Sequence, residues 1–209
     1  MIAVISGDLI KSQKIPKQEY DDMLYHLDQS LRFIADKFAG QFNIYRGDAM
    51  QIQLPDPHTV CCAAILLNLQ LRSANYSLRQ SMAIGQLDNP RADIKTATGS
   101  AYTLSGQGLD TLSHQQLLLQ IEQCQLDPSF ALNIDLIDVL LERMSQKQAN
   151  ALFYYLTTDN NSHAELAKEL KTSRENVTKL LNLANYQLIE RFLNYSRTAI
   201  HNQIQGVNK

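Results

Sequence analysis

The sequence predicts an α+β protein in which a ferredoxin-like antiparallel sheet domain precedes an all-α helix-turn-helix domain. Short β-branched runs alternate with amphipathic helical patterns in residues 1–125, and helical patterns follow. Charge divides the chain similarly, because residues 1–144 hold 11 basic and 16 acidic side chains whereas residues 145–209 hold 8 and 5. We therefore expect a sheet domain over 1–125, a connecting helix over 126–144 and a helix-turn-helix domain over 145–209.

The first two elements follow from hydrophobic periodicity. Residues 2–6 are apolar and end at Gly7 and Asp8, which predicts a buried strand with an acid at its C-terminal end. From residue 16 to 39 the apolar positions recur at spacings of three and four, and Gly40 follows. This pattern predicts an amphipathic helix that ends at the glycine.

The next stretch has the pattern of a β-hairpin. Residues 42–54 alternate apolar and polar side chains on either side of Gly47-Asp48. Glycine tolerates the positive φ that a two-residue hairpin loop requires, so we expect such a loop here. Further along the chain we expect helices at 58–72 and 99–112 and strands within 77–87 and 117–122, with helices covering one face of the sheet.

Two acids are candidates for a metal site. In this layout the end of the first strand and the tip of the hairpin lie side by side, which would bring Asp8 and Asp48 together. Two carboxylates provide hard oxygen ligands for magnesium and leave positions for phosphate oxygens. The alternative is structural, because Gly-Asp is common in turns and Asp8 could cap the connection after the strand.

Several protein classes are excluded by composition. The longest apolar run, residues 60–67, is far shorter than the roughly 20 residues that span a bilayer. Cys61, Cys62 and Cys124 are too few for a disulfide framework, and the histidines lack partners at zinc spacing. The first residues do not have the pattern of a signal peptide. We therefore expect a cytoplasmic protein without a membrane segment.

A family resemblance rests on four motifs. VISGDLIKS (4–12), YRGDAMQ (45–51), AIGQL (83–87) and LSGQGLDTL (104–112) occur in this order. Together they resemble the SatD family of bacterial proteins over nearly the whole chain. More distantly, the first half is similar to class III nucleotide cyclases and GGDEF enzymes.

The resemblance to cyclases implies a nucleotide site. One metal-binding aspartate of those enzymes follows the first strand and the other lies in the hairpin, which implies Asp8 and Asp48 as magnesium ligands here. The implied cofactors are Mg²⁺ and a purine nucleotide, and the candidate catalytic residues are Asp8, Asp48 and Arg46. We expect the nucleotide to contact Gly7, Asp8, Lys11, Ser12, Arg46, Gly47 and Asp48.

Departures from the cyclase pattern leave two alternatives open. Cyclases place an asparagine and an arginine in the helix that matches residues 103–112, where they stabilise charge during phosphoryl transfer. Leu104 and Gly108 stand at about these points, and Arg46, Lys11 or Gln107 would have to substitute. The first part is therefore expected to be either a nucleotide-sensing pocket or an active enzyme.

The last part has the proportions of a helix-turn-helix. Leu166, Ala167 and Leu170 can pack inward from one helix, Lys171-Thr172-Ser173 form a turn, and Val177, Leu180 and Leu181 can pack inward from the next. Capping-box spacing marks three helix starts, Ser145 with Gln148, Ser162 with Glu165 and Thr172 with Glu175. The outer face of the second helix would contact double-stranded DNA through Ser173, Arg174, Thr178, Lys179 and Asn182. The alternative is a small helical bundle with a solvated charged face.

Taken together, these patterns predict a homodimeric, DNA-binding transcriptional regulator with a degenerate cyclase-like nucleotide-sensing domain. The connecting helix carries an apolar stripe that faces either the sheet or a partner helix. A second interpretation is a magnesium-dependent nucleotide cyclase or nucleotidyltransferase with a helical regulatory domain. A third is an adaptor that binds another protein.

Overall fold

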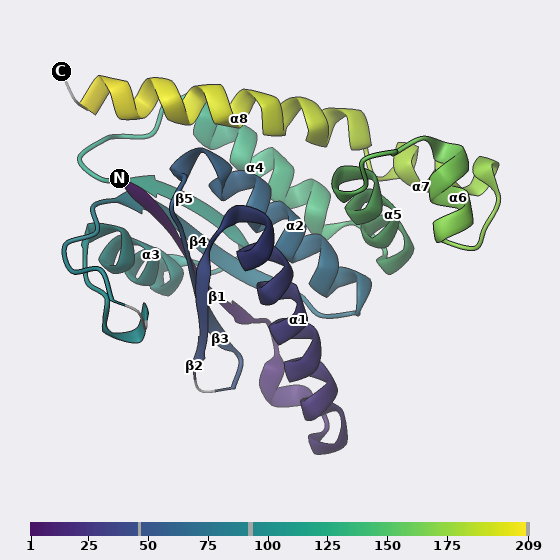
Figure 1. Ribbon diagram of the computed structural model, residues 1–209, viewed down its shortest axis with the longest axis horizontal. Coiled ribbons are helices and arrows are strands. Elements are labelled where there is room, and N and C mark those ends of the chain that lie inside the picture. The colour runs from purple at the N-terminus through teal and green to yellow at the C-terminus, as the bar shows by residue number, and fades with distance from the viewer. Residues whose placement is uncertain (46, 92–93, 208–209) are drawn as a thin grey trace.

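The computed structural model of the protein describes residues 1–45, 47–91 and 94–207. Within these residues the chain forms a five-stranded sheet with the strand order β2-β3-β1-β4-β5 (Figure 1). The three pairings among β2, β3, β1 and β4 are antiparallel, while β5 runs parallel to β4. The strands are β1 (Ile2–Leu9), β2 (Gln41–Tyr45), β3 (Ala49–Leu54), β4 (Leu78–Gly85) and β5 (Leu117–Ile121).

Helices lie on both faces of this sheet. Alternate strand residues such as Ile5 and Ile52 join the core beneath α1 (Tyr20–Phe38) and α2 (Val60–Ser73). Their neighbours point the other way, and Ser6 hydrogen-bonds Ser105 of α3 (Ser100–Thr111) at 2.9 Å. The predicted α+β fold is confirmed. The expectations that every pairing is antiparallel and that helices cover only one face are wrong.

Two predicted elements have different boundaries in the structure, since the first strand is longer and the first helix is shorter than the sequence pattern suggests. Strand β1 runs through Gly7 and Asp8 to Leu9, so Asp8 lies within the strand rather than after it. Helix α1 spans Tyr20–Phe38 rather than residues 16–39, and its C-cap, Ala39, takes the left-handed conformation at φ 53° that glycine usually adopts at the end of a helix. Short 3-10 turns occupy Ser12–Lys14, Lys17–Glu19, Pro57–Thr59 and Ile94–Thr96.

The C-terminal helices share the core with the sheet part. Helix α5 lies against α2, and α8 crosses over α4 and α2, while α6 and α7 project at one end (Figure 1). The boundaries predicted at residues 125 and 144 fall between elements, but the hydrophobic core continues across both. These helices are α4 (Pro128–Glu142), α5 (Gln146–Thr157), α6 (His163–Glu169), α7 (Arg174–Leu183) and α8 (Tyr186–Val207).

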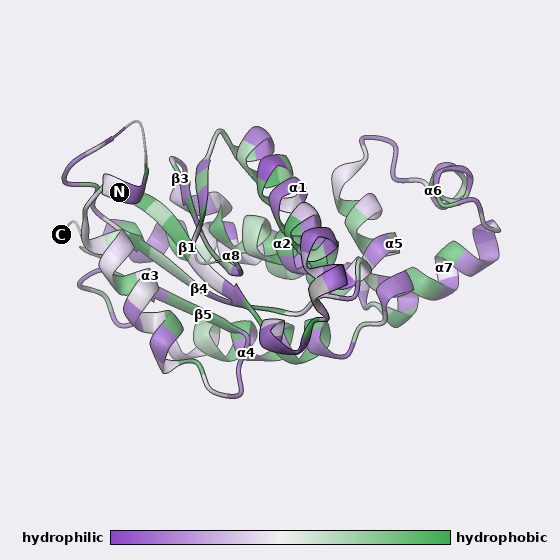
Figure 2. Cartoon of the chain, turned by 90° about the horizontal axis from the view of Figure 1, so that it is seen from below, coloured by the Kyte–Doolittle hydropathy of each residue, from purple (hydrophilic) through white to green (hydrophobic). Residues whose placement is uncertain are grey.

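Helix α4 turns its predicted apolar stripe towards the sheet rather than towards a partner helix. Phe130, Ile134, Ile137 and Leu141 are buried and belong to the core. The opposite face also carries apolar side chains, and Leu136 on it is 54% exposed. Apolar residues therefore cover both sides of α4, as the green colour of this helix in Figure 2 shows.

None of the helices in the described part of the chain has the length and apolar character needed to cross a membrane.

Candidate functional site

Three charged side chains meet at one end of the sheet because of the strand register. In the central strand β1, Asp8 lies opposite Ala49 of β3 on one side and opposite Arg79 of β4 on the other. Asp48 directly precedes Ala49. The fold thus brings Asp8 and Asp48 to the same place, as the sequence predicts, and adds an arginine that the prediction lacks.

These residues line a cleft of about 740 Å³. Its size lies within the range of small-molecule sites. The cleft is lined mainly by the loop after β1, the start of β4, the end of α2 and the loop before β5. The lining residues are Asp8, Leu9, Ile10, Lys11, Ser12, Gln13, Lys14, Asp48, Arg72, Ser77, Arg79, Ser113, His114, Gln115, Gln116 and Glu142.

Asp8 is held by a bidentate ion pair with Arg79. Nε of Arg79 donates to Oδ1 of Asp8 at 2.6 Å and Nη2 donates to Oδ2 at 2.7 Å, while Nη1 donates to the carbonyl oxygen of Leu112 at 3.0 Å. The hydrogen bonds to Asp8 raise the pKa of Arg79 above its ordinary value. The side chain of Asp8 is 24% exposed and that of Arg79 is 36% exposed, so water screens the pair only in part.

Asp48 is held from the loop after β1. The Ser12 hydroxyl donates to Oδ2 of Asp48, and the backbone N–H of Leu9 donates to the carbonyl oxygen of Asp48 at 3.3 Å. Tyr45 of β2 pairs with Ala49 of β3, so the two strands do not close around the predicted two-residue loop of Gly47 and Asp48. Arg46, the third catalytic candidate, lies outside the described residues.

The residues present do not fit a magnesium ion. Both carboxylate oxygens of Asp8 accept hydrogen bonds from Arg79, whose positive charge stands beside the carboxylate where a metal ion would have to bind. Oδ2 of Asp48 is engaged by Ser12. Within residues 1–45, 47–91 and 94–207, no group of three His, Cys, Asp or Glu side chains is arranged to hold a metal. The positive charge beside Asp8 is therefore supplied by the Arg79 side chain rather than by a metal ion.

Two of the predicted nucleotide contacts, Gly7 and Gly47, lie in close-packed positions. Gly7 is buried between strands, where a Cβ atom would lie 2.7 Å from Cε of Met50 and 2.8 Å from the carbonyl oxygen of Arg79. Gly47 has φ 89°, and a Cβ atom there would lie 1.8 Å from the hydroxyl oxygen of Tyr20. Close approach and positive φ explain both glycines without a ligand. Neither glycine lines the cleft, in contrast to Lys11 and Ser12.

The α3 position that corresponds to the missing cyclase arginine is closed by packing. A Cβ atom on Gly108 would lie 2.2 Å from Oγ of Ser81 and 2.5 Å from Oε1 of Gln120. The helix therefore touches the sheet at this point, and no side chain fits there. Gln107, a candidate substitute, is exposed and does not line the cleft.

Sequence reasoning missed two arginines of the cleft. Arg79 interrupts the apolar strand β4, and a charge in a strand buried by its neighbours is a signal that could have found it. Arg72 stands in the last turn of α2, where a basic residue is ordinary, so no pattern distinguishes it. Its Nη1 donates to the carbonyl oxygen of Glu142 at 3.0 Å, and burial lowers its pKa.

The second candidate site is formed by α6, the turn after it and α7. Leu166 and Ala167 of α6 and Val177 and Leu181 of α7 are buried, as expected for helices that cross closely. Lys171, in the turn between α6 and α7, has a positive φ of 50°, and this left-handed conformation changes the direction of the chain after α6. Leu170 and Leu180, the other two residues expected to pack inward, are half-buried.

The cap of α7 differs from the prediction by one residue. Ser173 is the N-cap, and its hydroxyl accepts a hydrogen bond from the N–H of Asn176 at 3.1 Å. Thr172, the predicted cap, accepts from the side-chain amide of Asn176 instead, at 2.9 Å. The predicted cap of α5 is confirmed, because Ser145 and Gln148 form a complete capping box.

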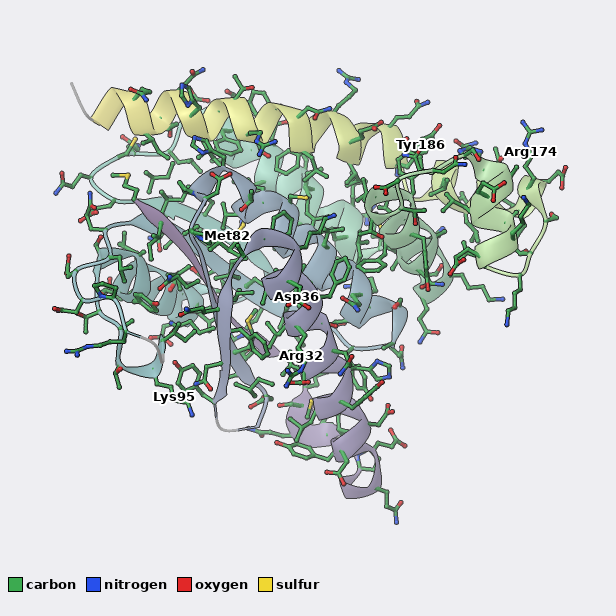
Figure 3. The ribbon with its side chains drawn as sticks, in the orientation of Figure 1. Arg32, Asp36, Met82, Lys95, Arg174 and Tyr186 are labelled. Atoms are coloured by element: carbon green, nitrogen blue, oxygen red, sulfur yellow. The ribbon has the colours of Figure 1, made fainter. Side chains whose placement is uncertain are left out.

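The predicted DNA-contacting residues are exposed with one exception. Ser173, Arg174, Lys179 and Asn182 are exposed, and Figure 3 shows Arg174 at the end of the molecule far from the sheet, pointing outward. Thr178 is half-buried. Its hydroxyl donates to the carbonyl oxygen of Arg174 at 3.0 Å and lies 2.8 Å from Nδ1 of His163.

The sequence matches no protein-family model and no curated protein. Among solved structures, the fold is similar to three nucleotide cyclases over 56% of this chain. A bacterial light-regulated adenylyl cyclase has a TM-score of 0.42 and 14% identity over 74% of its chain. The guanylyl cyclase Cya2 has a TM-score of 0.44 and 12% identity, with 73% of its chain covered. The adenylyl cyclase CyaB from P. aeruginosa has a TM-score of 0.42 and 16% identity, with 75% of its chain covered.

Proposed function

We propose that this protein is a DNA-binding transcriptional regulator of the SatD type whose sheet domain senses a nucleotide. The exposed outer face of α7 supports DNA binding most directly. Arg174 and Lys179 supply positive charge, and Ser173 and Asn182 supply hydrogen-bonding groups on the same helix. Helix α7 lies on the part of the molecule that projects beyond the core, where it is accessible for insertion into a DNA groove (Figure 1).

Salt dependence of DNA retention tests this proposal without knowledge of the operator. Fluorescence anisotropy with a labelled 30-base-pair random duplex is measured from low to physiological salt. The double variant Arg174→Ala/Lys179→Ala should bind at least tenfold more weakly, and its slope of log K against log salt should be shallower by about 2, one phosphate contact per removed charge. Lys147→Ala, an exposed cation on α5, is the control and should match the wild type. Equal slopes for all three proteins would contradict DNA binding through α7.

The proposal includes a homodimer, because a helix-turn-helix reader ordinarily contacts two half-sites. Exposed apolar side chains gather on α4 and α8, where Leu136, Leu188 and Tyr195 line a groove of about 440 Å³. A second copy of the chain is the proposed occupant of this face.

Sedimentation equilibrium between 1 and 100 μM tests the dimer. Leu136→Asp should shift the protein to the mass of a monomer, whereas Tyr25→Asp, at a 60% exposed position on α1, should not. A monomeric wild-type protein, or equal behaviour of the two variants, would contradict this interface.

An enzyme remains the second candidate because Asp8 and Asp48 do line one cleft. On that alternative the cleft would convert ATP or GTP into a cyclic or linear product. Incubation with each nucleotide and magnesium, followed by chromatographic analysis of products, distinguishes the two functions. Turnover that is lost in Asp48→Asn would favour the enzyme.

A further inference from the structure

The cleft contains a permanent cation next to Asp8. All three nitrogens of the Arg79 guanidinium donate to acceptors of the protein, two of them on Asp8 and one on the carbonyl oxygen of Leu112. An arginine held at every nitrogen cannot readily swing away, and it remains charged at any physiological pH. The negative charge of Asp8 is therefore neutralised within the protein.

Three further cations of the cleft have no acidic partner. Within the described residues, Lys11, Lys14 and Arg72 form no ion pair within 4.0 Å. The acids that remain unneutralised by an ion pair are Asp48 and Glu142. The cleft thus carries a positive balance once Asp8 and Arg79 are paired, which favours an anionic ligand.

Arg72 is the strongest anion-binding candidate among these cations. Its side chain is half-buried and donates to two neutral oxygens, the backbone carbonyl of Glu142 at 3.0 Å and Oε1 of Gln116 at 3.4 Å. Its Nε is buried and has no hydrogen-bond partner among the described residues. Glu142 and Asp138 act on Arg72 without forming an ion pair within 4.0 Å, and a partly desolvated guanidinium that lacks a direct ion pair gains more from a phosphate than an exposed lysine does.

We propose that the cleft binds the phosphate chain of a phosphorylated ligand directly through Arg72, Lys11 and Lys14, without a divalent metal ion. Arg79 supplies the positive charge at Asp8 that a metal ion would otherwise have to supply. This inference rests on the proposed sensing function and specifies its chemistry. The phosphate group is the recognised feature, and a nucleoside attached to it would lie elsewhere in the 740 Å³ cleft.

Calorimetric titration with two probes tests this inference. Inorganic tripolyphosphate and ATP are each titrated into the full chain in EDTA and, separately, in excess magnesium. Both probes should bind in EDTA at least as tightly as with magnesium. Tighter binding of ATP than of tripolyphosphate identifies a nucleotide, and equal binding identifies the phosphate chain as the whole determinant. Binding that requires magnesium, or no binding of either probe, overturns the proposal.

Variants locate the site. Arg72→Gln and Lys11→Ala/Lys14→Ala should each weaken tripolyphosphate binding at least tenfold in EDTA. Lys37→Ala, an exposed cation near the far end of α1, is the control and should bind like the wild type. Arg79→Gln should weaken binding in EDTA, because the charge of Asp8 is released, and magnesium should restore part of the loss. Equal binding by Arg72→Gln and the control overturns the proposal even if Arg79→Gln fails to fold.

The same preparations are tested for retention of the random DNA duplex. Intact DNA retention without phosphate binding overturns this inference and leaves the DNA-binding function standing. Phosphate binding without DNA retention overturns the DNA-binding function and leaves this inference standing.

Discussion

Nδ1 of His163 on α6 lies 2.8 Å from the hydroxyl oxygen of Thr178 on α7, and this contact joins the two helices. The hydroxyl of Thr178 also donates to the carbonyl oxygen of Arg174, so it stabilises α7 and its contact with α6. Four of the five residues expected to contact DNA are exposed, whereas Thr178 contributes to the packing of α7 on α6.

Thr178→Val should therefore separate stability from DNA contact. Valine keeps the shape of threonine but leaves His163 without this partner, which should lower the free energy of unfolding by about 1 kcal/mol. Chemical denaturation measures this loss. The slope of DNA retention against salt should stay that of the wild type, because no charge is removed. Weaker retention of the duplex at every salt concentration, with an unchanged slope, would instead place Thr178 in the interface.

The cap of α7 gives a second prediction. Ser173→Ala removes the side chain that accepts from the N–H of Asn176 and should cost about 1 kcal/mol of stability. Thr172→Ala is the matched control, because Thr172 bonds only the side-chain amide of Asn176 and should cost less. If urea denaturation finds the larger loss in Thr172→Ala, the helix begins one residue earlier than described.

These examples show which features of the structure can be predicted from the local sequence pattern. Apolar periodicity predicts α1, the hairpin and the crossing of α6 and α7, because burial of a helix face or strand face imposes its own period on the chain. The pattern also predicts that Asp8 and Asp48 lie close together, because the order of the strands places the end of β1 beside the hairpin. It does not predict the partner of Asp8, because Arg79 is 71 residues away and only the register of β1 with β4 brings the two together. The cap at Ser173 instead of Thr172 reflects a smaller uncertainty, since two adjacent hydroxyl residues fit the same start signal.

Gly47 provides a third prediction, on the hairpin. Its φ of 89° is strained for any other residue, and an added Cβ atom would overlap the hydroxyl oxygen of Tyr20. Gly47→Ala should lower the free energy of unfolding by about 2 kcal/mol. Gly106→Ala is the control, because nothing lies within 4 Å of its added methyl group and alanine favours a helix. Thermal denaturation should show a loss for the first variant and no loss for the second.

The thiol of Cys61 provides a fourth prediction. Burial raises its pKa to about 12, and it lies in α2 against Ser196 of α8. At pH 8 only about one thiol in ten thousand would then be ionised, and the thiolate is the reactive form. Cys61 should not react with iodoacetamide in the native protein and should react after unfolding in urea. Peptide mass mapping identifies the labelled residue. Fast native labelling of Cys61 would mean that α8 does not stay docked on α2.

Asp138 on α4 gives the last prediction, on the pH dependence of stability. Its carboxylate is 7% exposed, with Oδ2 accepting from the N–H of Gln116 at 2.8 Å and Oδ1 buried without a partner among the described residues. Burial raises the pKa of Asp138 above its unfolded value of 3.8. The folded state therefore binds the proton more tightly, so the stabilising contribution is fully present below pH 3.8 and is lost as pH rises through the higher folded pKa.

Asp138→Asn removes this titration while keeping an oxygen acceptor for Gln116. The difference in unfolding free energy, wild type minus Asp138→Asn, should therefore increase as pH falls from 7 towards 4. Asp36→Asn, at an exposed position on α1, is the control, since Asp36 does not act on the pKa of Asp138. Urea denaturation at a series of pH values measures both differences. If the wild type loses stability relative to Asp138→Asn as pH falls, the carboxylate is stabilised in its charged form, and the burial of Asp138 is not its dominant interaction.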